Sequence, residues 1–265
     1  MQSTIRRWGP WLALVLVFAL ATSALSWWQF SRRAERVERI EQVIQNYEST
    51  PIPYSELTWE TTGGTSSMEW TPVAVSGEYL PEHALLVRNR PLSGQPGFLQ
   101  LVPLRLDDGR LLIVERGWLI AGSDISAPLS NPLPDAIRSD LVLRLRVGEE
   151  SLGRDSTDTL ASIDLTEVAE RLSSLGEVIT EHYGRLAAES PSYAEAPVSM
   201  PKPSLDEGNH LSYAIQWIIF GIMAFIAFIW AYRNDRRIRL EEQGDLVPKA
   251  KKRTQADIDA EFEDA

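Results

Sequence analysis

The sequence contains no cysteine, and this absence excludes several kinds of site. Without thiols, the chain has no disulfide framework, thiolate zinc site, Cys-ligated copper, iron–sulfur cluster, covalent c-type haem or cysteine nucleophile. Histidine is scarce as well, with only His83, His182 and His210. Three histidines cannot build a His-rich metal cage within one chain, so direct copper binding is not expected.

Positive charge is in deficit. The chain contains 26 lysines and arginines and 37 aspartates and glutamates, which gives a formal net charge of −11. Nucleic-acid binding needs a basic footprint to neutralise phosphates, so we predict no nucleic-acid partner. The length of 265 residues allows one or two domains.

Motifs of common enzyme classes are missing from the sequence. It contains no P-loop, no GxGxxG, no HExxH and no GxSxG pattern. His83 lies in a predicted turn and His182 follows a predicted helix, so solvated or structural roles are expected for both. We therefore predict that the protein is not an enzyme, and a membrane-tethered enzyme is the least favoured function class.

Two apolar runs dominate the ends of the chain. No residue between Trp8 and Ser31 is charged, and neither is any residue of the 22-residue run 211–232. At about 1.5 Å per residue, such helices cross a hydrocarbon core of roughly 30 Å. We predict transmembrane helices over 11–31 and 210–232. A cleaved signal peptide is the alternative for the first run, but its apolar residues continue past the small residues at 21–24, which favours an uncleaved anchor.

The positive-inside rule predicts the orientation of these helices. Arginines and lysines follow the second run at positions 233, 236, 237, 239, 249, 251, 252 and 253. Because two spans return the chain to its starting side, we expect a multi-pass protein of the cell membrane with both termini cytoplasmic. The expected segments are a cytoplasmic N-terminus (1–10), the first helix (11–31), an extracytoplasmic domain (32–189), a Pro-rich tether (190–209), the second helix (210–232) and a disordered cytoplasmic tail, basic then acidic (233–265).

The central segment predicts an α+β domain with an antiparallel sheet or a partly closed barrel and short helices. Apolar residues at helical spacing indicate a helix over 33–48. Short turns, such as Asp-Asp-Gly at 107–109, separate strand-like runs and favour antiparallel pairing. The runs are 72–80, 84–90, 97–106, 110–119 and 141–147. A further helix over 162–176 begins at Asp164 as N-cap, with Glu167 at the capping-box position.

His210 is the candidate site residue because it opens the second apolar helix. At helical spacing it shares a face with Tyr213, Ala214, Trp217 and Gly221. The predicted topology places Trp27, Trp28 and Gln29 at the same depth, at the outer end of the first helix. An imidazole among aromatic rings suits a haem axial ligand, and it equally suits an interfacial anchor.

Several segments together resemble the surfeit locus protein family of cytochrome oxidase assembly factors, in its bacterial form. The segments are Trp-Gln-Phe-Ser-Arg at 28–32, Pro-Val-Ala-Val-Ser-Gly-Glu-Tyr at 72–79, Gly-Arg-Leu-Leu-Ile-Val-Glu-Arg-Gly-Trp at 109–118 and Asn-His-Leu-Ser-Tyr-Ala-Ile-Gln-Trp at 209–217. Their order and the two-helix frame extend the resemblance over nearly all of 11–235. Glu115 departs from the usual Asn, and Leu145 replaces a common Gly.

The resemblance implies that the protein assists assembly of the haem a–copper oxidase. It implies transient binding of haem a between the two helices and transfer to oxidase subunit I, with His210 as the haem contact and iron ligand. Candidate haem-binding residues are then His210, Tyr213, Trp217, Trp28 and Gln29. Expected partners are subunit I and other subunits of the oxidase or its supercomplex in the respiratory chain. The alternative function is a scaffold or accessory subunit that stabilises the oxidase without binding haem.

Residues 116–118 of the third segment carry further expectations. We predict a structural role for Gly117, as a bulge or a close approach of two backbones. For Arg116 and Trp118 the sequence does not distinguish a structural role from a partner-facing one.

Overall fold

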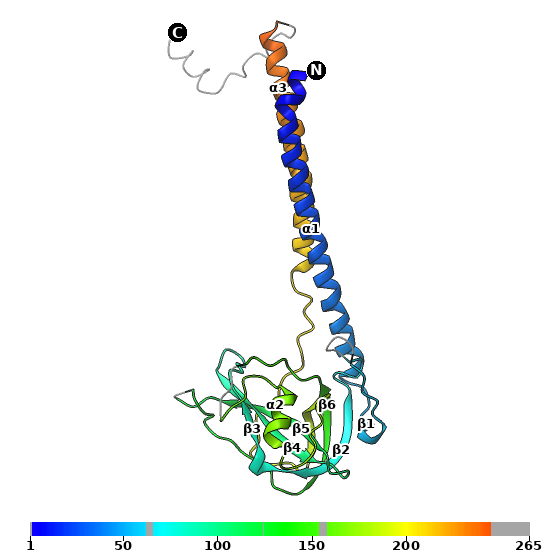
Figure 1. Ribbon diagram of the computed structural model, residues 1–265, viewed down its shortest axis with the longest axis vertical. Coiled ribbons are helices and arrows are strands. Elements are labelled where there is room, and N and C mark those ends of the chain that lie inside the picture. Colours follow the sequence, from blue (N-terminus) through cyan, green and yellow to red (C-terminus); the bar gives the residue numbers. More distant parts are fainter. Residues whose placement is uncertain (1, 62–65, 124, 154–157, 245–265) are drawn as a thin grey trace, which may run out of the picture. The chain divides into compact units, whose positions relative to one another are not determined.

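The chain folds into two units in the computed structural model, which describes residues 2–61, 66–123, 125–153 and 158–244 (Figure 1). One unit contains Met1–Arg36 and Glu207–Ala265, and the other contains Val37–Asp206. The first is built from α3 (His210–Glu242) and the part of α1 (Gln2–Asn46) up to Arg36. The second holds the seven strands and the short helix α2 (Leu165–Leu172).

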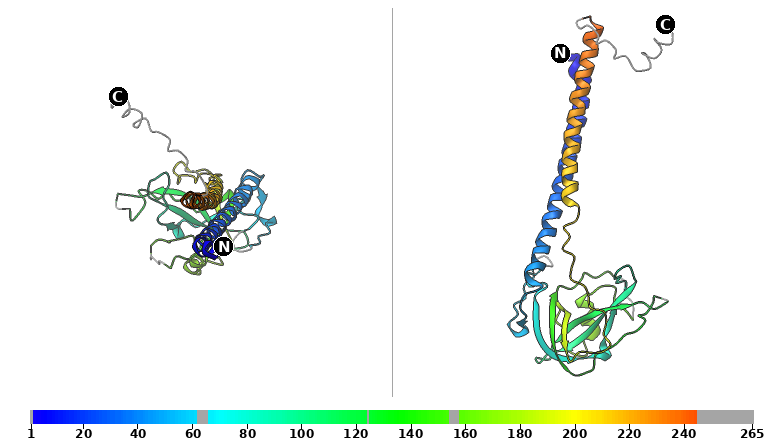
Figure 2. Two further views of the ribbon diagram at one scale, coloured as in Figure 1. Left: turned by 90° about the horizontal axis from the view of Figure 1, so that it is seen from above. Right: turned by 180° about the vertical axis from the view of Figure 1, so that it is seen from behind.

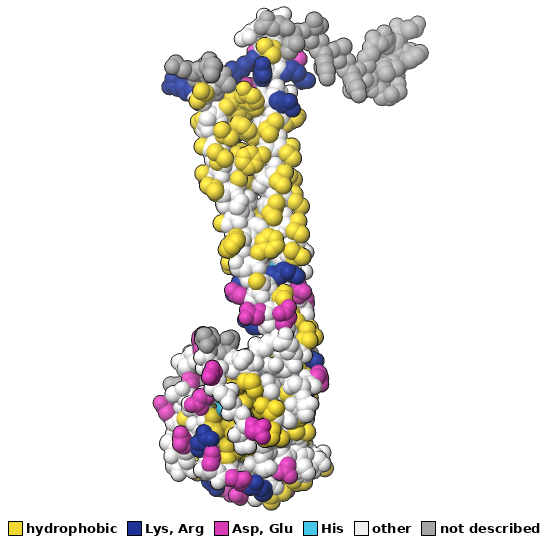
Figure 3. Space-filling view, turned by 90° about the vertical axis from the view of Figure 1, so that its right-hand side faces the viewer, with side chains coloured by type: hydrophobic (Ala, Val, Ile, Leu, Met, Phe, Trp, Pro, Cys, Tyr) yellow, Lys and Arg dark blue, Asp and Glu magenta, His cyan; other side chains and the backbone are white. Residues whose placement is uncertain are grey.

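Helices α1 and α3 lie antiparallel and side by side (Figure 2). Both are long and apolar enough to cross a membrane. Exposed apolar side chains cover the pair between two charged ends (Figure 3). This arrangement confirms the predicted fold class, with a transmembrane helix at each end of the chain.

Both helices extend further than the sequence predicted. The helices expected at 11–31 and 33–48 are one continuous helix that ends at Asn46. Helix α3 continues ten residues past the expected end at 232, supported by the ion pairs Arg239–Asp235 and Arg237–Glu241, each one turn apart. The prediction of disorder from residue 233 is therefore wrong through Glu242, and 245–265 lies outside the described residues.

Small residues form the seam between the two helices. Thr22 and Ser26 of α1 and Ala214 and Gly221 of α3 are buried there. The Ser26 hydroxyl donates to the Ala214 carbonyl oxygen at 3.1 Å, and a Cβ atom on Gly221 would lie 3.0 Å from Thr22 Oγ1. Apolar lipid provides no hydrophobic force between helices, so close packing and such polar contacts hold them together.

Asp235 joins the far ends of the same pair. Its carboxylate accepts from Arg7 at 2.7 Å and from the Trp8 indole at 3.2 Å. The Trp8 ring also packs edge-on against Phe228 and Tyr232. The N-terminal end of α1 and the C-terminal end of α3 are thus fixed together by charge and ring contacts.

A closed five-stranded β-barrel forms the second unit. The strands follow the order β2-β6-β7-β5-β4, and pairing of β2 with β4 closes the ring. Two edge strands, β1 (Ile52–Pro53) and β3 (Leu85–Val87), extend it. The barrel strands are β2 (Pro72–Tyr79), β4 (Gly97–Arg105), β5 (Leu111–Ile120), β6 (Arg138–Arg146) and β7 (Tyr183–Ser190). The predicted barrel is confirmed, although β1–β2 and β5–β7 pair in parallel.

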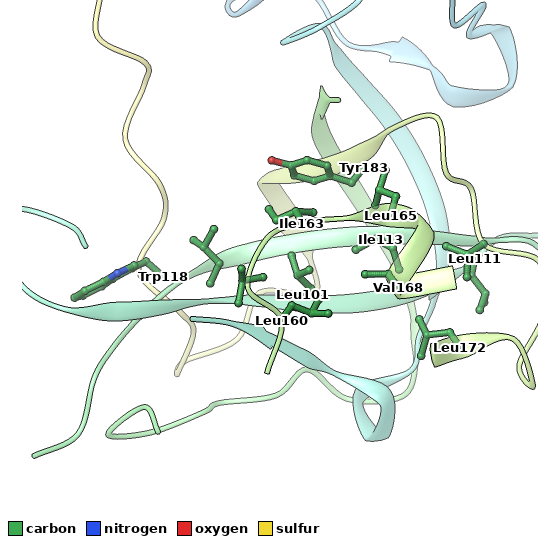
Figure 4. Close-up of a cluster of buried hydrophobic side chains, with 13 residues drawn as sticks. Leu101, Leu111, Ile113, Trp118, Leu160, Ile163, Leu165, Val168, Leu172 and Tyr183 are labelled. Carbon is green, nitrogen blue, oxygen red and sulfur yellow. The ribbon is translucent and has the colours of Figure 1, made fainter. Parts of the chain in front are cut away.

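The barrel has two apolar cores because its strands bury both faces. One cluster includes Val73, Leu104, Val114 and Leu143. The second lies under α2 (Figure 4) and includes Leu101, Leu111, Ile113, Leu160, Ile163, Leu165, Val168, Leu172 and Tyr183. Burial on both faces explains why β4 and β5 are almost continuously apolar in sequence.

Helix α2 is shorter than predicted, but its cap is correct. Asp164 accepts hydrogen bonds from the backbone N–H groups of Thr166 and Glu167 at 2.9 and 3.3 Å. Glu167 pairs with Arg171 at 2.5 Å rather than completing a capping box. The helix ends at Leu172, short of the expected residue 176.

Strand β7 was missed by the sequence reasoning. Its polar residues Arg185 and Glu189 hide the alternation typical of a strand, because their charges are satisfied inside the fold. Arg185 pairs with Glu115 at 2.9 Å and Glu189 pairs with Arg116 at 2.6 Å. No regular strand or helix is assigned between β7 and α3, the segment predicted as a tether.

Candidate functional site

The candidate site lies where α3 begins beside α1. The Nδ1 atom of His210 is 2.9 Å from the side-chain oxygen Oε1 of Gln29. Because an amide oxygen only accepts, Nδ1 carries the proton and Nε2 keeps its lone pair. Nε2 has no hydrogen-bond partner among the residues that the structure describes. The pair therefore presents one imidazole in a fixed tautomer with a free nitrogen.

An ion pair links α1 to the residue stretch just before α3, one turn away from Gln29. Arg33 of α1 donates to Glu207, just before α3, at 2.6 Å. Thr22, Ser26, Gln29 and Arg33 follow one another at intervals of four, three and four residues, the spacing of a helix–helix seam. Sequence reasoning missed Ser26, Arg33 and Glu207, although this spacing could have revealed the first two.

The residues predicted to share one face of the second helix differ in their burial. Ala214 lies buried in the seam, and Trp217 is half-buried and packs edge-on against Phe220 at 5.8 Å. Tyr213 and Trp28 are 50% and 53% exposed and project away from the seam. The fold thus brings His210 and Gln29 together, and it leaves the Tyr213 and Trp28 rings on the outer surface of the helix pair.

His182 has a structural environment. Its imidazole is buried, with Nε2 2.9 Å from the Tyr54 hydroxyl and the Trp59 ring 4.7 Å away. Burial lowers the pKa of His182 to about 4, so the ring is neutral near pH 7. No group of three or more potential metal ligands occurs among the described residues.

Gly117 has the structural role predicted for it. The register between β4 and β5 shifts so that Arg116 is the extra residue of a bulge. Gly117 adopts φ +151, and a Cβ atom there would lie 2.5 Å from the carbonyl oxygen of Val198. Both a bulge and a close backbone approach are present, which confirms the expectation.

Arg116 and Trp118 are both turned into the fold. The Arg116 guanidinium is buried between Glu189, Gln100 and the Pro132 carbonyl oxygen. The Trp118 indole is buried against Gly97 and donates to the Arg90 carbonyl oxygen at 2.5 Å. These contacts assign both side chains to the architecture of the domain.

The two departures from the family pattern are accommodated in the barrel. Glu115 is fully buried and pairs with Arg185, so its charge is compensated within the chain. Leu145 is buried among the apolar side chains of the first barrel cluster. Neither residue belongs to the helix pair that carries His210.

Comparison with known proteins decides the family. The model of the SURF1 family matches residues 16–222. The chain belongs to the SURF1 family. An uncharacterised SURF1-like protein of Mycobacterium bovis is 30% identical over 249 residues, which cover 90% of this chain and 89% of the relative. A SURF1-like protein of Rickettsia felis is 20% identical over 229 residues, which cover 84% and 96%.

Proposed function

We propose that this SURF1-family protein is a non-enzymatic assembly factor of the haem a–copper cytochrome c oxidase. In this proposal it binds haem a transiently at the level of His210 and Gln29 and passes it to oxidase subunit I. The observation that carries the proposal is the hydrogen bond between His210 Nδ1 and Gln29 Oε1, which leaves Nε2 available.

The donor set fits a haem. A ligating histidine commonly donates its other ring nitrogen to an oxygen, which fixes the tautomer and the ring orientation. Gln29 supplies that oxygen, so His210 Nε2 can serve as the axial ligand of the haem iron. The exposed Trp28 and Tyr213 rings would offer apolar surface for the macrocycle, and Trp217 follows Tyr213 one turn along α3.

The seam restricts where a haem can bind. Thr22 and Gly221 are in direct contact, and Ser26 bonds to the α3 backbone. A macrocycle bound to His210 would therefore lie on the outer surface of the pair and not within the seam. Coordination of the haem iron by one imidazole alone suits a haem that must be released again.

The proposed location is the cell membrane, with both termini cytoplasmic and the barrel outside. Its support is the contact between the N-terminal end of α1 and the C-terminal end of α3, where several arginines gather. Basic residues favour the cytoplasmic side of a bilayer. Subunit I and other oxidase subunits are the proposed partners.

Absorption spectra of detergent-purified protein, co-expressed with haem a synthesis, test the proposal. We expect a haem a band in the wild type, loss of the band in His210→Ala and a weaker band in Gln29→Leu. His83→Ala is the matched control, because it removes a histidine of the other unit. Undiminished haem a in His210→Ala contradicts the ligand assignment. A colourless wild type that still captures the oxidase supports the scaffold function instead.

A further inference from the structure

A small polar cavity of about 290 Å³ lies in the barrel unit. Its lining includes three arginines and one carboxylate. The polar lining residues are Asn89, Arg90, Arg146, Glu149, Tyr183 and Arg185. Arg90 uses both terminal nitrogens on Glu149, so these two charges neutralise each other.

Arg146 and Arg185 are also ion-paired, each with a carboxylate outside the cavity lining, so they offer the cavity the hydrogen-bond donors of their terminal nitrogens. The Nε atom of Arg146 donates to Glu69 at 2.8 Å, and Nε of Arg185 lies 2.9 Å from a Glu115 oxygen. Both guanidinium groups also lie over the Trp70 ring, at 4.0 and 5.3 Å from its centroid. These contacts fix the two planes without engaging their terminal nitrogens.

The terminal Nη nitrogens of these two arginines have no hydrogen-bond partner in the described part of the chain. Each guanidinium can therefore donate several further hydrogen bonds. Because the planes are already oriented, little side-chain entropy remains to be lost when an acceptor binds.

The Tyr183 hydroxyl adds one more donor. Only 2% of this residue is exposed, and its ring packs at the edge of the α2 cluster with the hydroxyl directed outward (Figure 4). The residue lines the cavity, and its hydroxyl forms no hydrogen bond with another described residue. Burial raises the pKa of Tyr183, so the hydroxyl keeps its proton and can donate.

We propose that this cavity binds a small oxyanion, the phosphate or carboxylate group of a small molecule, on Arg146, Arg185 and Tyr183. The fork of guanidinium N–H groups matches the oxygens of both groups. The volume is at the lower limit of ligand pockets, which selects a compact ligand. The site involves no residue of the helix pair, so the proposal does not depend on haem binding.

Isothermal titration of the full-length protein in detergent at pH 7, with inorganic phosphate and separately with malonate, tests this site. We expect saturable binding of at least one of the two anions, and the preferred anion shows which oxyanion geometry the site selects. Arg146→Lys keeps the charge beside Glu69 but removes the fork, and we expect about tenfold weaker binding. Tyr183→Phe keeps the ring packing and should also weaken binding.

Arg138→Lys is the control, because Arg138 forms an exposed ion pair with Asp107 outside the cavity. The Arg138→Lys variant should bind the anions with the same affinity as the wild type. The proposal is overturned if neither anion binds saturably, if the two cavity variants bind as tightly as the wild type, or if Arg138→Lys loses as much affinity. Circular dichroism verifies folding, and Tyr183→Phe provides a conservative test should Arg146→Lys unfold.

Discussion

The buried charge of Arg116 should be essential to the stability of the barrel. Its guanidinium donates to Glu189 at 2.6 Å and to Gln100 at 3.2 Å, and it lies near the rings of Tyr79 and Tyr193. The Arg116 side chain is fully buried and that of Glu189 is 9% exposed. Replacing Arg116 with Met keeps much of the volume but leaves the Glu189 carboxylate with one donor among the described residues, the Tyr79 hydroxyl at 3.1 Å.

The expected loss follows from the energetics of buried ion pairs. Removing one partner of such a pair costs about 3–5 kcal/mol, because an uncompensated charge stays buried. For a unit of about 170 residues, this corresponds to a fall in Tm of roughly 6–20 °C. Adding Glu189→Gln to Arg116→Met removes the orphaned charge, so we expect the double variant to recover part of the loss.

Thermal unfolding of the detergent-solubilised chain, followed by circular dichroism in the β region, measures these changes. Arg138→Met is the matched control, since it removes an arginine from an exposed pair with Asp107. Its Tm should stay close to that of the wild type, because exposed ion pairs contribute little. Equal Tm values for Arg116→Met and Arg138→Met would refute the reasoning.

Two further predictions concern the same unit. Gly117→Ala should lower the free energy of unfolding by about 1–3 kcal/mol, because the new Cβ atom combines a positive φ with a collision against the Val198 carbonyl oxygen. Gly109→Ala is the comparison: Gly109 also has a positive φ, but a Cβ atom there meets open space, so this variant should cost less. Urea unfolding of both variants measures the difference. His182 has a pKa of about 4 when folded, below its unfolded value of about 6.5, so the unfolded state binds more protons in that range and stability falls as the pH is lowered from 6.5 towards 4. The free energy of unfolding, measured by urea titration, should be lower at pH 5 than at pH 7 by on the order of 2 kcal/mol in the wild type and by less in His182→Asn. Equal differences in both proteins would contradict the assignment.

Local patterns in the sequence were sufficient for the helices and most strands. An uncharged apolar run of more than 20 residues has few alternatives to a spanning helix, and Asp164 identifies the start of α2 because capping depends on neighbouring backbone groups. The turn at 107–109 similarly locates the β4–β5 hairpin. An apolar run, an N-cap and a turn each depend on residues that are close together in the sequence, so they can be recognised without knowledge of the fold.

Contacts between distant residues could be decided only by the tertiary structure. Gln29 and His210 are 181 positions apart, and only the antiparallel packing of α1 and α3 places Oε1 beside Nδ1. The spacing of His210 and Tyr213 suggested one shared face, but seam packing turns the Tyr213 ring outward.

Strand β7 shows the same limit for secondary structure. Arg185 and Glu189 are polar in sequence and typical of a surface loop, yet they lie in the barrel because Glu115 and Arg116 of β5 neutralise them. The amino-acid order by itself determined the two membrane helices and the hairpins, since those depend on local hydrophobicity and turn chemistry. Tertiary packing alone decided which charges are buried together and which imidazole nitrogen is free, since both depend on partners far along the chain.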